Sequence, residues 1–111
     1  MIIELQGHIE TLGEGKLSAT TGTLYTAPEG VSVFVTLITL SPGGASNRTC
    51  NIYLNRGGTR SRITPKDLTL RPGYLVELDS GYTLKPGDLI EGDAGAADEV
   101  DYTISGIVKR G

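Results

Sequence analysis

Few side chains in this 111-residue sequence are of the types that carry out covalent catalysis, because it has one histidine, His8, and one cysteine, Cys50. A serine or cysteine nucleophile needs a base within hydrogen-bonding reach, and His8 stands isolated in a polar stretch, which favours a surface or interface side chain. Cys50 lies in an alternating run on the same face as Ile52 and Leu54, which predicts a small buried core residue. We therefore predict no nucleophilic catalytic residue and no internal disulfide.

Carboxylates are the remaining candidates for acid–base chemistry. Glu77 and Glu91 occupy matching places in a repeated pattern, and so do Asp79 and Asp93. A pair of carboxylates can act as general acid and base. Each of these acids follows a turn on a short predicted strand, where solvated acids are ordinary, so we do not expect glycosidase-like chemistry.

An acidic run over residues 91–101 carries five carboxylates. Calcium takes about six to eight oxygen ligands, so the run is a candidate calcium loop. It lacks the ordered D-x-[DN]-x-[DN]-G spacing, which favours a solvated acidic loop instead. We predict no metal and no cofactor, with calcium as the alternative.

Charge is distributed unevenly along the chain. Residues 77–101 hold eight acids against Lys85 alone, whereas residues 46–66 contain no acid. The basic residues of that second segment are Arg48, Arg56, Arg60, Arg62 and Lys66. This asymmetry indicates oriented contact with a charged partner or between copies of the chain, because a guanidinium makes bidentate pairs with carboxylates. A solvated hairpin that carries arginines is the alternative.

The overall charge and the N-terminus exclude two classes of partner. The net charge of −3 supplies no field to hold a polyphosphate backbone, so nucleic acid is not an expected partner. The opening MIIELQGHIE has no basic lead and no long apolar run, so neither a signal peptide nor a membrane helix is expected. We expect a soluble protein made in a cytoplasm.

Period-two alternation recurs along the chain, and no ten-residue window carries a convincing helical apolar stripe. Short strands separated by tight turns, with 16 glycines in all, are typical of a two-layer structure. We predict an all-β, single-domain, jelly-roll-like antiparallel β-sandwich. Besides a strand from Val31 and a last strand through Tyr102, the predicted strands are Ile2–Ile9, Leu17–Tyr25, Thr49–Asn55, Arg60–Ile63, Tyr74–Leu78 and Asp88–Glu91.

The strand that begins at Val31 has a pattern of its own. Simple alternation places Val31, Val33, Val35 and Leu37 on one face, and Ser32, Phe34, Thr36 and Ile38 on the other. The second face becomes more apolar toward Leu40, which predicts a strand that ends covered on both faces.

A fourteen-residue echo relates two segments near the middle of the chain. Residues 70–79 and 84–93 share the pattern L-[KR]-P-G-x-L-[VI]-E-x-D. Proline presets φ for the first central position of a turn and glycine accepts φ > 0 at the second, so both Pro-Gly pairs predict type II turns. The run 94–99 is the most helix-tolerant segment, but it is short and we predict a loop.

The order of these motifs resembles a known family. GTLYTAPEG at 22–30, a Val/Thr-rich strand, CNIYL at 50–54, two L-x-P-G turns and VDYTISGI at 100–107 resemble small β-sandwich structural proteins of tailed bacteriophages, over roughly residues 20–108. Within that group the chain looks like the capsid decoration, or staple, proteins of epsilon15-type phages. The resemblance implies a non-enzymatic protein, synthesised in the bacterial host cytoplasm, that binds the outer surface of an icosahedral capsid. Its implied partners are the major capsid protein and a second copy of itself, in a homodimer that bridges neighbouring capsomers.

Two parts of the chain are distinguished on this basis. Residues 20–111 form the sandwich, whereas Met1–Ala19 is either an arm that reaches a neighbouring subunit or the first strand of the same sandwich. The predicted capsid or subunit contacts are Met1, Ile2, Ile3, Leu5, Ser41, Asn47, Arg48, Arg56, Arg60 and Arg62.

Two other functions remain alternatives. One is a tail- or fibre-associated sandwich that binds a host glycan or receptor, although there is no tryptophan and the five tyrosines are scattered. The other is a cupin-like metalloenzyme, for which one histidine is too few.

Overall fold

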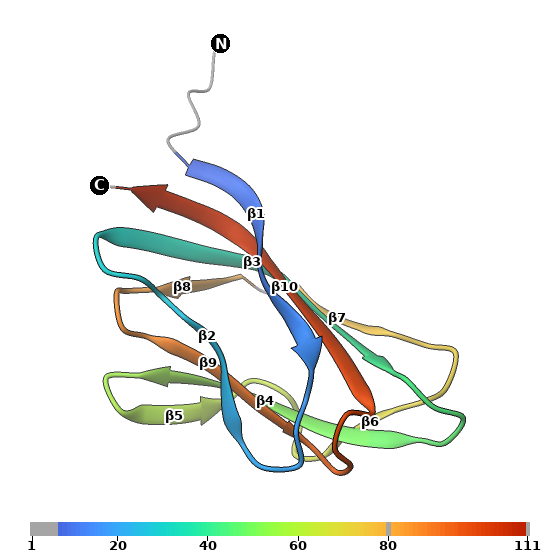
Figure 1. Cartoon of the computed structure of the whole chain (residues 1–111). Helices are drawn as coiled ribbons and strands as arrows, with labels where there is room; N and C mark the ends of the chain where they lie inside the picture. The colour runs from blue at the N-terminus through green and yellow to red at the C-terminus, as the bar shows by residue number, and fades with distance from the viewer. Residues whose placement is uncertain (1–6, 80, 111) are drawn as a thin grey trace.

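The computed structural model of the chain describes residues 7–79 and 81–110, and every regular element among them is a β-strand. The strands form two antiparallel sheets of five (Figure 1). The first sheet consists of β1 (Gly7–Lys16), β10 (Val100–Arg110), β3 (Val31–Pro42), β7 (Val76–Leu78) and β8 (Tyr82–Leu84). The second sheet consists of β2 (Gly22–Thr26), β9 (Leu89–Ala94), β4 (Arg48–Arg56), β5 (Thr59–Arg62) and β6 (Leu68–Leu70). Among the described residues there is also no helix suited to spanning a membrane.

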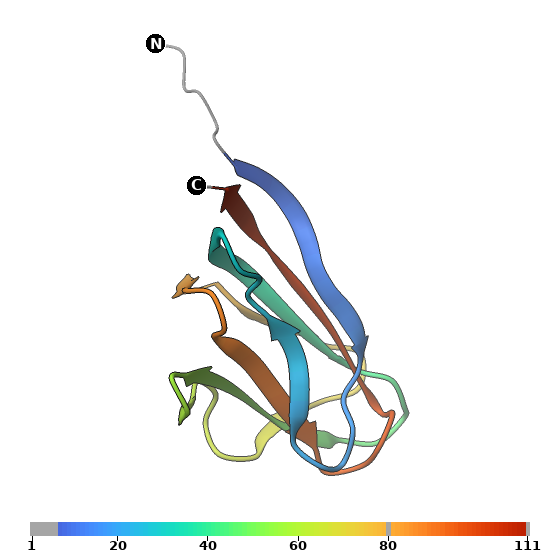
Figure 2. The same cartoon turned by 60° about the vertical axis from the view of Figure 1, so that its left-hand side comes forward.

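The strand order is that of a jelly roll. Strand β1 pairs with β10, β2 with β9, β3 with β8, and β4 with β5 and β6, so the chain follows one long hairpin. The hairpin is rolled up by the pairings of β10 with β3 and of β9 with β4, which divide it into two layers. Figure 2 shows the layers from the side, with β1 and β10 adjacent along one of them. The prediction of an all-β, jelly-roll-like sandwich is confirmed.

The core lies between the two sheets. Its fully buried side chains come from both layers and from the connections, and they include Leu17, Val33, Val35, Ile38, Leu40, Ile52, Leu70, Leu84, Ile90, Val100 and Ile104. Burial of each such side chain stabilises the folded state by roughly 1.5–3 kcal/mol, because its apolar surface is removed from water. Cys50 is also fully buried, as its place in the alternating run predicted.

The β3 strand corrects the simple alternation. Its register against β10 shifts so that Val35 opposes Gly106 and Leu37 opposes Ser105, which leaves Thr36 as an extra residue in a β-bulge. The buried positions therefore change parity, from Val31, Val33 and Val35 to Ile38 and Leu40. The expectation that Leu37 faces inward was wrong, whereas no residue of β3 after Phe34 is exposed, in agreement with a strand that becomes covered on both faces toward its end. An inserted residue reverses the facing of every side chain that follows it.

Both predicted Pro-Gly turns are present. The glycines have positive φ, 82° at Gly73 and 88° at Gly87. The amide of Tyr74 donates to the carbonyl of Arg71 at 3.2 Å, and the amide of Asp88 donates to that of Lys85 at 2.9 Å. These are the torsions and the hydrogen bond of a type II turn.

Several strand boundaries differ from the expected ones. The expected strand Ile2–Ile9 is observed as β1 over Gly7–Lys16, and the expected Leu17–Tyr25 begins only at Gly22. Leu17 is instead a buried connection residue whose amide donates to the carbonyl of Val100 at 2.9 Å. Strands β6 and β8 were not expected, because three residues are too few to display a period. Met1, Ile2, Ile3 and Leu5 lie outside the described residues, so an arm at these positions stays a prediction.

Candidate functional site

The basic hairpin β4–β5 is joined to the acidic strand β9 within the same chain. Register places Asn55 opposite Arg60 and Tyr53 opposite Glu91, so a side chain from β5 crosses β4 to reach β9. Arg60 donates from Nε to Oε1 of Glu91 at 2.9 Å and from Nη2 to Oε2 at 3.2 Å. Its guanidinium lies 5.4 Å from the centroid of the Tyr53 ring. Nδ2 of Asn55 donates to the same carboxylate at 3.1 Å.

The electrostatics of this pair are those of a structural contact. Only 7% of Glu91 is exposed. The hydrogen bonds from Arg60 lower the pKa of Glu91, against the opposing effect of burial. The same hydrogen bonds raise the pKa of Arg60. A carboxylate held ionised in this way suits a fixed ion pair better than a proton donor.

Asp93 and Asp101, two of the other acids of residues 91–101, have separate partners. Asp93 accepts from Oγ1 of Thr21 at 2.6 Å and from Nδ2 of Asn51 at 3.0 Å. Asp101 pairs with Lys16 at 2.6 Å on the exposed surface. Over residues 7–79 and 81–110, no three His, Cys, Asp or Glu side chains converge as metal ligands would. The paired acids proposed from the echo lie in different sheets, with Glu77 on β7 and Glu91 on β9.

A second group of predicted contacts lies at the connection between β3 and β4. Ser41 is half-buried at the end of β3, and Asn47 is exposed just before β4. Arg48 approaches Glu99, with 3.9 Å between Nε and Oε2. The amide of Gly43 donates to the carbonyl of Glu99 at 2.8 Å, which fastens this connection to the β9–β10 loop.

The predicted contact residues thus form two groups rather than one patch. The connection between the end of β3 and the start of β4 lies at the right of Figure 1, whereas the tip of the β4–β5 hairpin lies at the left. Strand β4 connects the two groups and, at about 3.4 Å per residue, separates them by roughly 27 Å. The hairpin arginines Arg56, Arg60 and Arg62 are all exposed.

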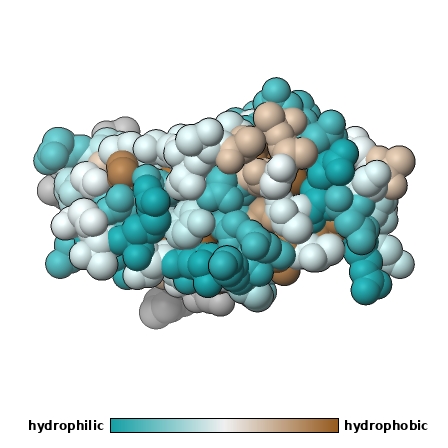
Figure 3. Space-filling view, turned by 90° about the horizontal axis from the view of Figure 1, so that it is seen from below, coloured by the Kyte–Doolittle hydropathy of each residue, from teal (hydrophilic) through white to brown (hydrophobic). Residues whose placement is uncertain are grey.

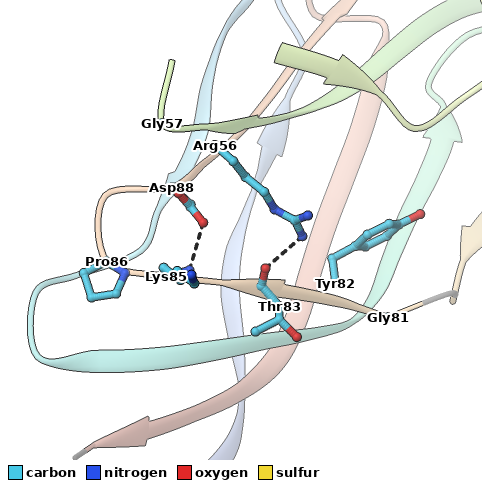
Figure 4. Close-up of a pocket in the computed structure, with 8 residues that line it drawn as sticks. All are labelled: Arg56, Gly57, Gly81, Tyr82, Thr83, Lys85, Pro86 and Asp88. Carbon is cyan, nitrogen blue, oxygen red and sulfur yellow. Dashed lines mark hydrogen bonds between the residues drawn. The ribbon is translucent and has the colours of Figure 1, made fainter. Parts of the chain in front are cut away.

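A pocket that the sequence did not indicate lies beside the hairpin. Its volume is about 790 Å³, and it opens between the tip of the β4–β5 hairpin and the β8–β9 turn. Arg56 reaches across it and donates from Nη2 to the carbonyl of Thr83 at 2.8 Å (Figure 4). Lys85, Pro86 and Asp88 line the other side. The one available signal was the shared L-[KR]-P-G pattern, which marked the turn but not what it would face.

Within residues 7–79 and 81–110, four large hydrophobic side chains that were not predicted as contacts are exposed. They are Ile9 at 73%, Phe34 at 45%, Tyr74 at 71% and Leu75 at 55% exposure. Ile107 on β10 pairs with Ile9 on β1 and with Phe34 on β3, which forms an apolar row across the outer face of the first sheet. Hydrophilic and neutral residues cover most of the face seen in Figure 3, with brown areas small and separate.

Comparison with known proteins bears on the fold. No protein-family model and no curated protein sequence matches the chain. Among solved structures, it is similar to a protein of Bacillus endospore appendages, which form a family of disulfide-linked pili. That likeness covers 99% of this chain and 96% of the other, at 14% identity and a TM-score of 0.51.

Two pentameric capsid proteins isolated from metagenomic phage sequences are also similar. They are 20% and 19% identical, with TM-scores of 0.45 and 0.44. The likeness covers 96% of this chain in both cases but only 66% and 67% of those chains. Identities this low concern the fold alone.

Proposed function

We propose that this chain is a non-enzymatic structural protein of a tailed-bacteriophage particle. It binds the outer surface of the icosahedral capsid and staples neighbouring subunits of the major capsid protein, so that the DNA-filled head is stabilised. The proposal rests on the sequence resemblance over roughly residues 20–108 and on the distribution of the contact residues.

The observation that carries the proposal is the separation of two contact groups by one continuous strand. Arg48 and Arg56 are the first and last residues of β4, which is hydrogen-bonded to β9 on one side and to β5 and β6 on the other. A strand paired on both sides holds its two ends at a fixed distance. Simultaneous contact with two fixed subunits raises the effective concentration of each second contact, so weak individual contacts suffice.

The internal ion pairs assign different roles to the arginines. Arg60 is engaged by Glu91, and Arg48 lies near Glu99. Arg56 donates to a neutral carbonyl, and Arg62 has no ion pair within the described part of the chain. We therefore assign the capsid contact of the hairpin chiefly to Arg56 and Arg62, with Arg60 as a residue that holds the hairpin in position.

A homodimer and an N-terminal arm complete the proposal. Two copies would double the number of capsid contacts that one assembly makes. Removal of Met1–Leu5 should lower occupancy on the particle and leave the free protein folded. Unfolding of the free truncated protein would refute the arm and favour a role in the chain's own sandwich. Sedimentation analysis would measure the oligomeric state.

The main experiment compares particles with and without the protein. Particles that lack it should release DNA at a lower temperature, because fewer contacts resist internal pressure. Particles carrying an R56Q/R62Q double variant should show reduced occupancy, whereas K66Q, which removes an exposed charge between β5 and β6, serves as the control. Equal heat stability of particles with and without the protein would rule the proposal out.

A glycan- or receptor-binding role on a tail or fibre is a second candidate, favoured by one observation. Tyr74 is 71% exposed beside the exposed Leu75, and exposed aromatic rings are the usual platforms for sugars. Binding of the isolated protein to a glycan array, abolished by Y74A, would support this candidate over the capsid role.

A further inference from the structure

The pocket beside the β4–β5 hairpin has two walls that belong to different sheets. The hairpin tip comes from the second sheet, and β8 with its following turn comes from the first and leads into β9. The hydrogen bond from Arg56 to the carbonyl of Thr83 joins these walls at 2.8 Å. The hydrogen bond therefore directs the guanidinium of the exposed Arg56 across the pocket toward β8 (Figure 4).

The charges that face this pocket are two cations and one carboxylate. Arg56 and Lys85 line it, and neither forms an ion pair within residues 7–79 and 81–110. The carboxylate belongs to Asp88, which is 8% exposed and accepts the backbone amide of Lys85 at 2.9 Å. The Asp88 carboxylate therefore stabilises its own turn, and the two cations leave the pocket with a net positive charge.

The donors of Arg56 are only partly used. A guanidinium carries about five N–H donors in a planar fork, and the contact with Thr83 occupies one of them. The fork matches the two oxygens of a carboxylate. Arg60 makes such a bidentate contact with Glu91 inside the chain, whereas Arg56 has only a neutral carbonyl as acceptor.

The rim that carries Lys85 is rigid. The type II turn at Pro86-Gly87 closes through the Asp88 amide, and the amide of Gly87 donates to the carbonyl of Ala27 at 2.9 Å. The amide of Ala27 in turn donates to the carbonyl of Asp88 at 2.9 Å. Because the backbone of this rim is preformed, binding of a ligand has to order only the Lys85 side chain and not the turn.

Size and lining select the class of ligand. A volume of about 790 Å³ exceeds what one carboxylate fills and accommodates a side chain with its flanking backbone. Tyr82 and Pro86 add apolar wall beside the two cations. A polyphosphate chain is disfavoured by the net charge of −3 on the whole molecule.

We infer that this pocket binds a carboxylate presented by an acidic segment of a protein partner, with Arg56 as the bidentate contact and Lys85 as the second cation. That the partner is a capsid subunit rests on the proposed function. The affinity of the pocket for an acidic peptide does not, and it can be measured on the free protein.

The test is an amide-resolved NMR titration of the full chain with short peptides. The first probe is an N-acetylated, C-amidated tetrapeptide with two glutamates, and its glutamine counterpart is the control. We expect shifts around Arg56, Thr83 and Lys85 with the acidic peptide, weakened by added salt, and none with the glutamine peptide. Equal shifts with both peptides would overturn the inference. A glutamate-free peptide with an unblocked C-terminus shows whether a chain end serves as the carboxylate.

Variants separate a specific site from general attraction to positive charge. R56Q and K85Q should each weaken binding about tenfold, as loss of a charged hydrogen bond implies. K66Q, which removes an exposed charge outside the pocket, should bind like the unmodified protein. Equal weakening by K66Q and R56Q would refute a defined site, and K85Q supplies the same test should R56Q unfold. Binding of inorganic phosphate at this pocket without binding of the acidic peptide would also refute it.

Particle occupancy distinguishes failure of this inference from failure of the proposed function. Loss of peptide binding by R56Q together with loss of occupancy would support both. If R56Q abolishes peptide binding but leaves particle occupancy unchanged, the pocket is a carboxylate site that does not contribute to the capsid contact. No peptide binding by the unmodified protein, with normal occupancy, would overturn the pocket and leave the capsid role standing.

Discussion

The bulge at Thr36 predicts which of two neighbouring side chains, Leu37 or Ile38, stabilises the core, and this prediction is the opposite of the one from simple alternation. Ile38 is fully buried and Leu37 is half-buried, whereas period-two counting from Val31 places Leu37 inside and Ile38 outside. Substitution of each by alanine removes three carbon atoms, so the two variants are matched in chemistry. They differ only in which side of the sheet loses them.

The expected magnitudes follow from burial. At about 0.8 kcal/mol for each buried carbon, I38A should lower the free energy of unfolding by roughly 2.4 kcal/mol. A residual cavity brings the range of this loss to about 2–5 kcal/mol. L37A, half-buried, should lose about 1 kcal/mol. For a domain of this size the midpoint of thermal unfolding should fall by about 10–20 °C for I38A and by about 5 °C for L37A.

Urea denaturation followed by circular dichroism measures both free energies of unfolding, with unchanged m values as the check on two-state behaviour. V35A is the control. Val35 faces the core with or without a bulge, so its substitution by alanine should strongly lower the free energy of unfolding in either case. A loss for L37A equal to or larger than that for I38A would refute the register shift.

Three further predictions concern single sites. G106A should lower the free energy of unfolding by about 1–3 kcal/mol, because a methyl group there would lie 2.5 Å from a carbonyl oxygen of the neighbouring strand. The control is G22A, where the added methyl group would lie 3.9 Å from the nearest atom. It should change the stability by less than about 0.5 kcal/mol in the same thermal unfolding assay. Because Arg60 lowers the pKa of Glu91 below its ordinary 4.5, the unmodified protein should be more stable than E91Q at pH 7. That advantage should disappear as the pH falls below about 4.5 through the folded-state pKa, and denaturant titrations that give one constant difference from pH 7 to pH 3 would contradict it. Burial raises the pKa of Cys50 from 9.0 to about 11, so its thiolate fraction at pH 8 should fall roughly hundredfold, and Ellman's reagent should react far more slowly with the native than with the urea-unfolded protein; similar rates would show that the thiol is accessible.

The contacts that define the candidate site were only partly predictable. The basic segment and the acidic segment are visible in the sequence, but their direct pairing through Arg60 and Glu91 joins residues 31 positions apart. The bond from Arg56 to Thr83 joins residues 27 positions apart across two sheets. Lys85 was recognised only as a turn residue. No local pattern states which side chain a turn will face.

The sequence by itself determined the features that depend on nearest neighbours along the chain. The Pro-Gly turns follow from the fixed φ of proline and the positive φ open to glycine, and the burial of Cys50 follows from strict alternation with Ile52. Only the tertiary structure decided the features that depend on packing between distant strands. The bulge at Thr36 and the short strands β6 and β8 arise from pairing between strands within one sheet, and the pocket that Arg56 spans arises where the two sheets meet. One extra residue in a bulge reverses which side chains of a strand face the core, and the pocket wall is shared by segments that are distant in sequence. The periodicity within a single strand predicts neither feature.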